Sequence, residues 1–282
     1  MQIVHAIAQL RLALQGNSPV ALVPTMGNLH AGHLDLVRLA KQHANCVVVS
    51  IFVNPLQFGA NEDLASYPRT LAADCEKLQA AGASIVFAPA VAEMYPDFDG
   101  HQLNQSISVQ LPPIAQDLCG ASRPGHFAGV ATVVLKLFNL VQPQFAVFGK
   151  KDYQQLFIIQ ELVKQFNLPI QIIAADTVRE PSGLAMSSRN GYLSAAEKTQ
   201  ASQLHAALLD MVEQLKSAQA DWLSLQQAAT LKLQQQGWQV DYVAIRAASN
   251  LQAATSDDRD LVVLAAAKLG KTRLIDNIRV KL

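Results

Sequence analysis

The fold is decided by residues 20–43, which read VALVPTMGNLHAGHLDLVRLAKQH. The first four residues are apolar and rich in valine, so they predict a short buried strand over Val20–Val23. A glycine-containing turn follows, and Leu34–His43 then repeats apolar residues every three or four positions, which predicts an amphipathic helix. A strand, a turn and a helix in this order form half of a β-α-β unit.

The same alternation continues through the first 177 residues. The predicted strands are Val20–Val23, Cys46–Phe52, Ser84–Ala88, Phe145–Phe148 and Ile170–Ala174. The predicted helices between them are Leu34–His43, Thr70–Ala81, Val130–Val141 and Gln154–Asn167. This order predicts an α/β fold with a Rossmann-like, doubly wound parallel sheet. Ligands of such sheets bind beyond the carboxyl ends of the strands.

The pattern changes after about residue 177. Two helices are predicted over Ser194–Leu215 and Asp221–Gln235, followed by strands over Gln239–Arg246, Leu261–Ala267 and Thr272–Asp276. We therefore predict two domains: residues 1–177, which bind the ligand, and residues 178–282, a smaller α+β domain that closes over the site.

Composition excludes several classes of protein. The chain has 282 residues, of which 50% are hydrophobic, and its 22 basic and 22 acidic side chains cancel. Such a chain is globular rather than disordered, and it lacks the basic excess that nucleic-acid binding needs. Its apolar runs fall short of the ~20 residues that cross a bilayer, so no membrane partner is expected. The three cysteines are widely spaced and no secretion signal is evident, so we expect a reducing cytoplasm.

Two histidines, His30 and His33, stand where the first helix begins. The free amides and the dipole of a helix start favour an anion, and imidazoles there can donate hydrogen bonds to oxygens that gain charge in a reaction. The pair could instead bind a metal ion, but zinc needs three or four ligands and no suitable partner is close in sequence.

Other polar groups also follow predicted strands. Asn54 and Gln57 follow the second strand, and their amides suit a polar substrate, although on their own they could equally be loop-capping residues. The next segment, Ala60–Arg69, is equally consistent with a mobile lid and with an ordinary surface loop. Gly149-Lys150-Lys151-Asp152 follows the strand that ends at Phe148, and Met186-Ser187-Ser188-Arg189 offers hydroxyls and a guanidinium; both segments suit phosphate oxygens.

Taken together, these motifs resemble the pantoate–beta-alanine ligase family of class I adenylate-forming enzymes, which carry a His-x-Gly-His motif. The resemblance is carried by segments 24–33, 50–58, 123–130, 148–155 and 186–190, in order and spacing. It implies that ATP activates the carboxylate of (R)-pantoate as an adenylate, with Mg²⁺ assisting and pyrophosphate leaving. β-Alanine then attacks this intermediate to give pantothenate and AMP.

The resemblance also implies roles for individual residues. His33, His30 and Lys151 would be catalytic, and Gln57 and Gln155 would hold pantoate, with Gln57 also near β-alanine. Asn54 and Arg123 are further substrate-binding candidates. The residues implied to contact ATP are Met26, Gly27, Asn28, Leu29, His30, Ala31, Gly32, His33, Gly149, Lys150, Lys151, Asp152, Val178, Met186, Ser187, Ser188 and Arg189. Family members are homodimers, so a homodimer is expected.

Two positions depart from the family pattern. Lys150 stands where many relatives have an acidic residue, which leaves open which lysine meets phosphate, and Ala60 stands in the presumed lid where proline is common. Two other functions remain open at this stage: a nucleotidyltransferase that passes AMP to a phosphate-bearing acceptor, and a non-catalytic module that binds ATP or tRNA.

Overall fold

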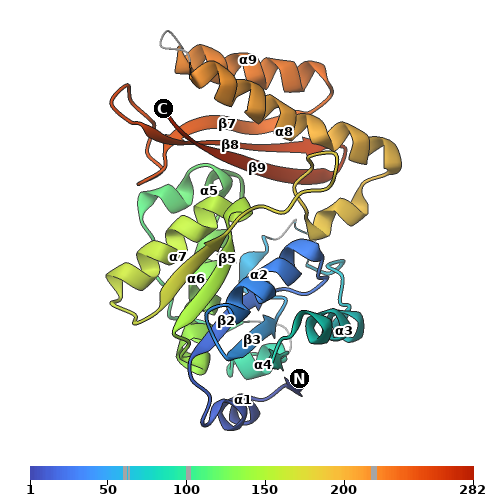
Figure 1. Ribbon diagram of the computed structural model, residues 1–282, viewed down its shortest axis with the longest axis vertical. Helices are drawn as coiled ribbons and strands as arrows, with labels where there is room; N and C mark the ends of the chain where they lie inside the picture. The colour runs from blue at the N-terminus through green and yellow to red at the C-terminus, as the bar shows by residue number, and fades with distance from the viewer. Residues whose placement is uncertain (60–61, 63, 100–102, 217–220) are drawn as a thin grey trace.

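The larger part of the molecule is a six-stranded parallel sheet (Figure 1). The computed structural model describes residues 1–59, 62, 64–99, 103–216 and 221–282. The strands are β1 (Gln2–Val4), β2 (Val20–Thr25), β3 (Cys46–Ile51), β4 (Ile85–Phe87), β5 (Phe145–Gly149) and β6 (Gln171–Ala175). Their order, β1-β4-β3-β2-β5-β6, confirms the predicted doubly wound sheet. The strand β1 was not predicted, because three residues are too few to show a period.

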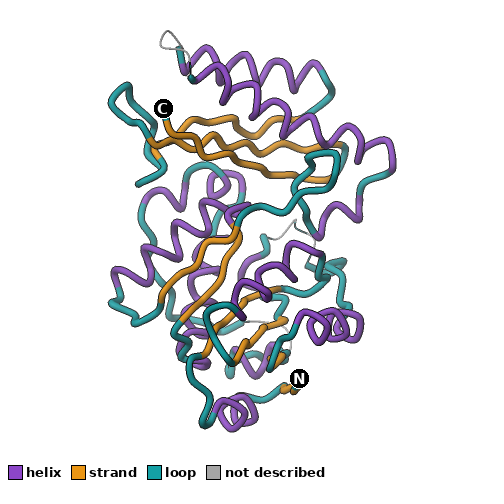
Figure 2. Tube along the Cα trace, viewed as in Figure 1, coloured by secondary structure: helices purple, strands orange, loops and turns teal. Residues whose placement is uncertain are grey.

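Helices cover both faces of this sheet, as Figure 2 also shows. α1 (Ile7–Leu14), α6 (His126–Val141) and α7 (Tyr153–Gln165) pack on one face, and α2 (Ala31–Lys41) and α3 (Leu71–Ala81) pack on the other. Successive residues of β3 alternate between the two: Val48 packs in the first core, and Val47 and Val49 pack in the second. Because both faces are buried, the strands read as continuous apolar runs.

Two helices begin earlier than predicted. α2 starts at Ala31 instead of Leu34, and α6 starts at His126 instead of Val130. Apolar periodicity marks only the part of a helix that packs on the core. Gly32 and His33 in the first turn of α2, and His126 and Gly129 in the first turn of α6, interrupt the apolar repeat, although Phe127 is buried. The predicted helices were therefore each missing the turn that faces the candidate site.

The second unit is a three-stranded antiparallel sheet under two helices. α8 (Ala195–Leu215) and α9 (Trp222–Gln235) pack on β7 (Gln239–Ala247), β8 (Asp260–Leu269) and β9 (Thr272–Lys281). The smaller α+β unit is thus confirmed, although β9 runs five residues beyond the predicted Asp276. The other face of this sheet packs on Ile114 and Leu118 of the first half. The boundary at residue 177 stays a prediction.

Short helical segments are also present. They are η1 (Pro55–Gln57), α4 (Val91–Met94), η2 (Pro113–Gln116), α5 (Cys119–Ser122), η3 (Lys150–Asp152) and η4 (Ser188–Tyr192). Three of them, η1, α4 and η3, follow strands. Within the described ranges, each helix is too short or too polar to cross a membrane.

The two central strands separate as they approach their carboxyl ends. β2 pairs with β3 over six residues but with β5 only at Ala21 and Leu22. Beyond Leu22 the sheet opens between β2 and β5, where the strand order also reverses. Ligands of doubly wound sheets bind at such a reversal.

Candidate active site

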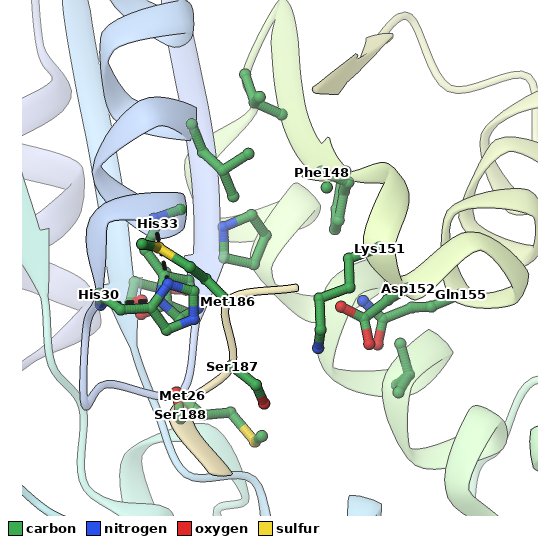
Figure 3. Close-up of a pocket in the computed structure, with 18 of the residues that line it drawn as sticks. Met26, His30, His33, Phe148, Lys151, Asp152, Gln155, Met186, Ser187 and Ser188 are labelled. Carbon is green, nitrogen blue, oxygen red and sulfur yellow. Dashed lines mark hydrogen bonds between the residues drawn. The ribbon is translucent and has the colours of Figure 1, made fainter. Parts of the chain in front are cut away.

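A cavity of about 230 Å³ lies between the separated ends of β2 and β5. One side is formed by the start of α2 and the other by Lys151, Asp152 and Gln155, which follow β5 (Figure 3). The loop 186–189 crosses beside it, and apolar residues of α6 close its inner end. The cavity thus combines a polar mouth with an apolar end, as ligand sites commonly do.

His30 and His33 stack at the start of α2, with ring centroids 4.1 Å apart. His30 is the N-cap residue, and its Nδ1 accepts a hydrogen bond from the amide of Gly32 at 3.2 Å. The amide of His30 donates to Nδ1 of His33 at 3.4 Å. A Cβ on residue 32 would lie 3.0 Å from the His30 ring, so a larger residue there would press against this imidazole.

Both imidazoles are neutral at physiological pH. Burial, with Lys151 adding to it, lowers the pKa of His30 to about 4. Burial and the neighbouring His30 lower the pKa of His33 to about 3. A neutral ring whose Nδ1 accepts a hydrogen bond carries its proton on Nε2. Each ring therefore keeps an Nε2–H donor for a ligand, and the backbone fixes which nitrogen carries it.

The turn before α2 does not offer the free amides that the sequence suggested. The carboxylate of Asp74, which is fully buried, accepts hydrogen bonds from the amides of Asn28 and Leu29, each at 2.8 Å. Gly27 donates its amide to the Thr25 hydroxyl and adopts a φ of +83°. These amides are occupied because the turn needs them to hold its own shape. The amides of Asn28, Leu29 and Gly32 are therefore not free for an anion, and the two imidazoles line the cavity at this helix start.

The two adjacent lysines have different surroundings. The ammonium of Lys150 forms an ion pair with Asp176 at 2.6 Å, and Lys150 does not line the cavity. Lys151 does line it, and within the described part of the chain its ammonium has no hydrogen bond or ion pair. Figure 3 shows Lys151 on the other side of the cavity from the histidines. The geometry makes Lys151 the lysine that can meet an anion.

Gln57 is positioned by buried partners. Its Oε1 accepts a hydrogen bond from Nδ2 of Asn54 at 3.0 Å, so its own amide N–H groups are left to face the cavity. Asn54 is fully buried and is itself held by the Tyr95 hydroxyl at 2.7 Å and the carbonyl of Gly129 at 3.1 Å. Asn54 therefore supports Gln57 and does not line the cavity.

Arg123 and His126 hold the backbone of Gln57 from outside. Nδ1 of His126 donates to the Gln57 carbonyl at 2.8 Å, and Arg123 approaches the same oxygen at 3.3 Å. Arg123 also forms a two-pronged ion pair with Glu62, with N–O distances of 2.7 and 2.6 Å. Burial opposes the charge of Glu62, but Arg123 outweighs it, and the pKa of Glu62 is lowered. The ion pair joins the segment after η1 to the start of α6.

α6 packs closely against the backbone of η1 and so fixes the position of that segment. A Cβ on residue 129 would lie 2.1 Å from the carbonyl oxygen of Leu56 and 2.9 Å from the amide nitrogen of Gln57. Only glycine allows α6 to pass this close to the segment that carries Gln57.

The loop that carries Met186–Arg189 is tied to the turn before α2. Ser188 donates its hydroxyl hydrogen to the carbonyl of Asn28 at 3.1 Å, and Nδ2 of Asn28 donates back to the Ser188 carbonyl at 3.4 Å. Ser187 caps η4 and lines the cavity. Segments 160 residues apart in the chain thus form one wall.

The two glutamines after Tyr153 have separate roles. Gln154 is 4% exposed and bonds to the amide of Cys119 and the carbonyls of Ile114 and Asp117, so it joins α7 to α5 and η2. Gln155 lines the cavity with Asp152.

A second cavity of about 440 Å³ adjoins the first and shares its wall at Lys151, Asp152, Ser187 and Arg189. It reaches the β8–β9 hairpin, where Lys268 and Lys271 add positive charge, and Arg123 lines it too. The local charge is therefore cationic although the whole chain is neutral.

Most predicted site residues meet at the first cavity. Its wall contains Met26, His30, Gly32, His33, Gln57, Gly149, Lys151, Asp152, Gln155, Val178, Met186, Ser187, Ser188 and Arg189. Outside its wall lie Gly27, Asn28, Leu29, Ala31, Asn54, Arg123 and Lys150. Of the presumed lid, Ala60, Asn61 and Asp63 lie outside the described residues, and Tyr67 lines the cavity.

The sequence analysis assigned no individual role to three supporting residues. They are Asp74, which holds the turn before α2; Gly129, which admits η1; and Asn277, which binds the backbone of η3. Asp74 lies inside a helix, where nothing in the sequence distinguishes it from an ordinary helical residue. Gly129 stands in segment 123–130, so the family resemblance was a signal that could have found it.

Comparison with known proteins matches this chain to one family over nearly its whole length. The family model described as "Pantoate-beta-alanine ligase" matches residues 2–279. The pantothenate synthetase of Methylobacillus flagellatus is 60% identical, with 99% of this chain and 98% of the relative covered. That of Thiobacillus denitrificans is 59% identical, with 99% and 97% covered.

Solved structures of this family have the same fold as this chain. The pantothenate synthetase of Thermus thermophilus has a TM-score of 0.93 and 42% identity over 100% of both chains. The pantoate-beta-alanine ligase of Francisella tularensis, solved with "Beta-gamma ATP and Beta-alanine", has a TM-score of 0.81 and 34% identity, with 99% of this chain and 97% of that chain covered.

Proposed function

The chain belongs to the pantoate–beta-alanine ligase family, and we propose that the first cavity is where it joins its substrates. The reaction is the ATP-dependent condensation of (R)-pantoate with β-alanine through a pantoyl adenylate. In the first step a pantoate carboxylate oxygen attacks the α-phosphorus, and the bond to pyrophosphate breaks. In the second, the amine of β-alanine attacks the acyl carbon, loses a proton and displaces AMP.

One observation carries the assignment of roles: two neutral imidazoles face an unpaired lysine across the cavity in the described part of the chain. Negative charge grows on the α-phosphate and on the departing pyrophosphate in the first step. The Nε2–H groups of His30 and His33 donate to these oxygens, and the Lys151 ammonium neutralises them. Because the rings are fixed by the backbone, little reorganisation accompanies the reaction.

Pantoate occupies the apolar end of the cavity in this proposal. Val130, Val133 and Leu137 of α6 line that end and suit the two methyl groups of the acid. Gln57 and Gln155 face the same space and bind its oxygens. Asn54 and Arg123 act through Gln57, because one holds its side chain and the other approaches its carbonyl.

ATP spans from the histidines toward the second cavity. Gly149, Asp152, Val178 and the residues Met186–Arg189 line its path, and the cationic second cavity takes the phosphate tail. The backbone amide of Asn28 is bonded to Asp74 and is therefore not free to bind ATP. In this proposal Asn28 acts on ATP indirectly, by holding the shape of the turn before α2. We propose that the smaller unit covers this site and limits water, to which an acyl adenylate is sensitive.

Mg²⁺ fits this site as part of Mg–ATP. Groups of three or more metal-binding side chains are not found in the described ranges, but Asp152 lines both cavities beside Lys151. Mg²⁺ is usually held by one or two carboxylates together with substrate phosphates and water. Asp152 would hold the ion, which would draw charge from the leaving pyrophosphate.

We also propose a cytoplasmic homodimer. The family resemblance supports the dimer, and light scattering on the purified protein tests it. All three cysteines are free and buried, which is consistent with a reducing compartment.

The decisive test is the exchange of labelled pyrophosphate into ATP. The wild-type protein should catalyse exchange when pantoate is present and β-alanine is absent, because adenylation is reversible. Exchange without pantoate would indicate another acid substrate. A folded sample that shows no exchange with pantoate would refute the adenylate route, and a dinucleotide product would identify a nucleotidyltransferase.

A further inference from the structure

The carboxyl-terminal strand β9 reaches the catalytic lysine through one side chain. Nδ2 of Asn277 donates hydrogen bonds to the carbonyl of Lys150 at 2.9 Å and to the carbonyl of Lys151 at 2.8 Å. These carbonyls belong to η3, the single turn that aims the Lys151 side chain into the cavity. Asn277 is 8% exposed, so water does not compete strongly for these bonds.

The neighbouring residue anchors the loop on the opposite side of the cavity. Asp276 accepts two hydrogen bonds from Arg179, at 2.7 and 2.9 Å, and Arg179 also donates to the carbonyl of Gly183 at 3.0 Å. Arg179 begins the segment that leads to Met186, and the amide of Met186 is bonded to the carbonyl of Val178 at 2.9 Å. Asp276 thus fixes the base of the loop that carries Met186–Arg189.

The two side chains are linked to each other. The amide of Asn277 donates to Oδ1 of Asp276 at 2.8 Å, so the pair joins the two walls, with Asp276 bonded to Arg179 and Asn277 bonded to the carbonyls of η3. Burial opposes the charge of Asp276, but His205, whose Nδ1 lies 3.3 Å from Oδ2, and Arg179 lower its pKa. A charged and well-bonded Asp276 makes this end of β9 a rigid point between the two walls of the cavity.

The η3 turn needs such a support. It is three residues long, and a 3₁₀ segment of this length supplies few hydrogen bonds of its own. Lys151 is also without a partner of its own among the described residues. Its direction is therefore set by the backbone on which it stands, and that backbone is bonded from the second unit by Asn277.

We propose that Asn277 is a positioning residue for Lys151 and that, with Asp276, it sets the spacing between Lys151 and the Met186–Arg189 loop. This rests on the proposed role of Lys151 in adenylation. It assigns β9 a part in catalysis although neither side chain of the pair lines the first cavity and only Asp276 lines the second. The smaller unit then acts as a part of the catalytic geometry, in addition to covering the site.

The expected effect follows from the sensitivity of such reactions to geometry. A displacement of about 1 Å in a reacting group can slow a reaction about 10²-fold. Replacement of Asn277 by alanine should therefore slow pantoate-dependent exchange by about 10²-fold and leave the KM for β-alanine unchanged. Asn277→Asp should be equally damaging, because it keeps the size of the side chain but removes both N–H donors.

The test is a double-mutant cycle with Lys151→Ala. If Asn277 acts through Lys151, the loss caused by Asn277→Ala should vanish when Lys151 is already alanine, since non-additivity is the signature of residues that act together. Gln226→Ala is the matched control: this amide also makes two backbone bonds, at 3.0 Å each, but both stay within the second unit. It should lower the melting temperature and leave the exchange rate within about twofold.

The outcomes separate the two proposals. If Lys151→Ala itself leaves exchange intact, the proposed role of Lys151 is wrong, and the positioning role fails with it. If Lys151→Ala is damaging but Asn277→Ala costs the same factor with and without it, only the positioning role is overturned. It is also overturned if Asn277→Ala resembles Gln226→Ala, with a lower melting temperature and unchanged exchange.

Discussion

Replacement of each of the adjacent lysines, Lys150 and Lys151, should have different effects, because their surroundings differ. Lys151→Ala removes a cation that faces the cavity without a partner within the described residues, whereas Lys150→Ala removes one that is already paired with Asp176. We expect the first variant to slow adenylation strongly and the second to have little effect, although both changes remove one positive charge from the same turn.

The magnitudes follow from these surroundings. A donor aimed at charge that develops in a transition state contributes about 2.7–4 kcal/mol, so Lys151→Ala should reduce the adenylation rate by about 10²–10³-fold. Lys150 is 37% exposed and Asp176 is 90% exposed. An ion pair of this kind contributes about 0–1 kcal/mol, so Lys150→Ala should cost less than about fivefold.

Pyrophosphate exchange and single-turnover formation of pantoyl adenylate measure the step directly. Melting temperatures of both variants serve as the control for folding. If Lys150→Ala is the more damaging change, the lysine that meets phosphate has been misassigned by one residue. Equal losses would mean that only the net charge near the cavity matters and that the geometry of η3 does not.

Three other predictions concern the histidines and the packing around Gln57. His33→Ala should slow adenylation by about 10²-fold or more with the fold intact, and a wild-type kcat would remove His33 from the mechanism. Because burial lowers the pKa of His30 and His33 to about 4 and about 3, while unfolded imidazoles titrate near about 6.5, the unfolded chain binds more protons below that pH. The free energy of unfolding should therefore fall as the pH is lowered from about 6.5 to about 4, by up to about 1.4 kcal/mol per pH unit for each ring. Urea unfolding should show a smaller fall in the variant in which His30 and His33 are both replaced by glutamine. An equal fall would contradict the assigned pKa values. Gly129→Ala should raise the KM for pantoate or unfold the protein, because the added Cβ would lie 2.1 Å from a backbone oxygen of η1, whereas Gly191→Ala, which has open space around it, should match the wild type.

The sequence was sufficient for the architecture. Valine-rich runs and amphipathic helices alternate in a way that only a covered parallel sheet satisfies, and β2 to β6 lie close to where periodicity placed them. The predicted boundaries were least accurate at the ends of elements. β1 is three residues long, α2 and α6 begin three and four residues before their predicted starts, and β9 continues past Asp276 with Ile278 and Val280 packed on the core of the second unit.

The sequence also predicted which residues would meet at the site. Residues that follow buried strands of a parallel sheet must meet at one edge, and His30, His33, Gln57, Lys151 and Gln155 do so. Their order along the chain was enough for this, because each strand ends at the same side of the sheet.

Only the tertiary structure decided how each group is presented. The neutral state of the imidazoles depends on burial by distant segments, and the choice of Lys151 over Lys150 depends on Asp176, 26 residues from Lys150. Asp74 occupies the amides that the turn motif seemed to leave free, and Asn277 reaches η3 from 126 residues away. A sequence records which side chains follow a strand. Which of them remains unpaired depends on contacts between segments far apart in the chain, and these form only when the whole chain has folded.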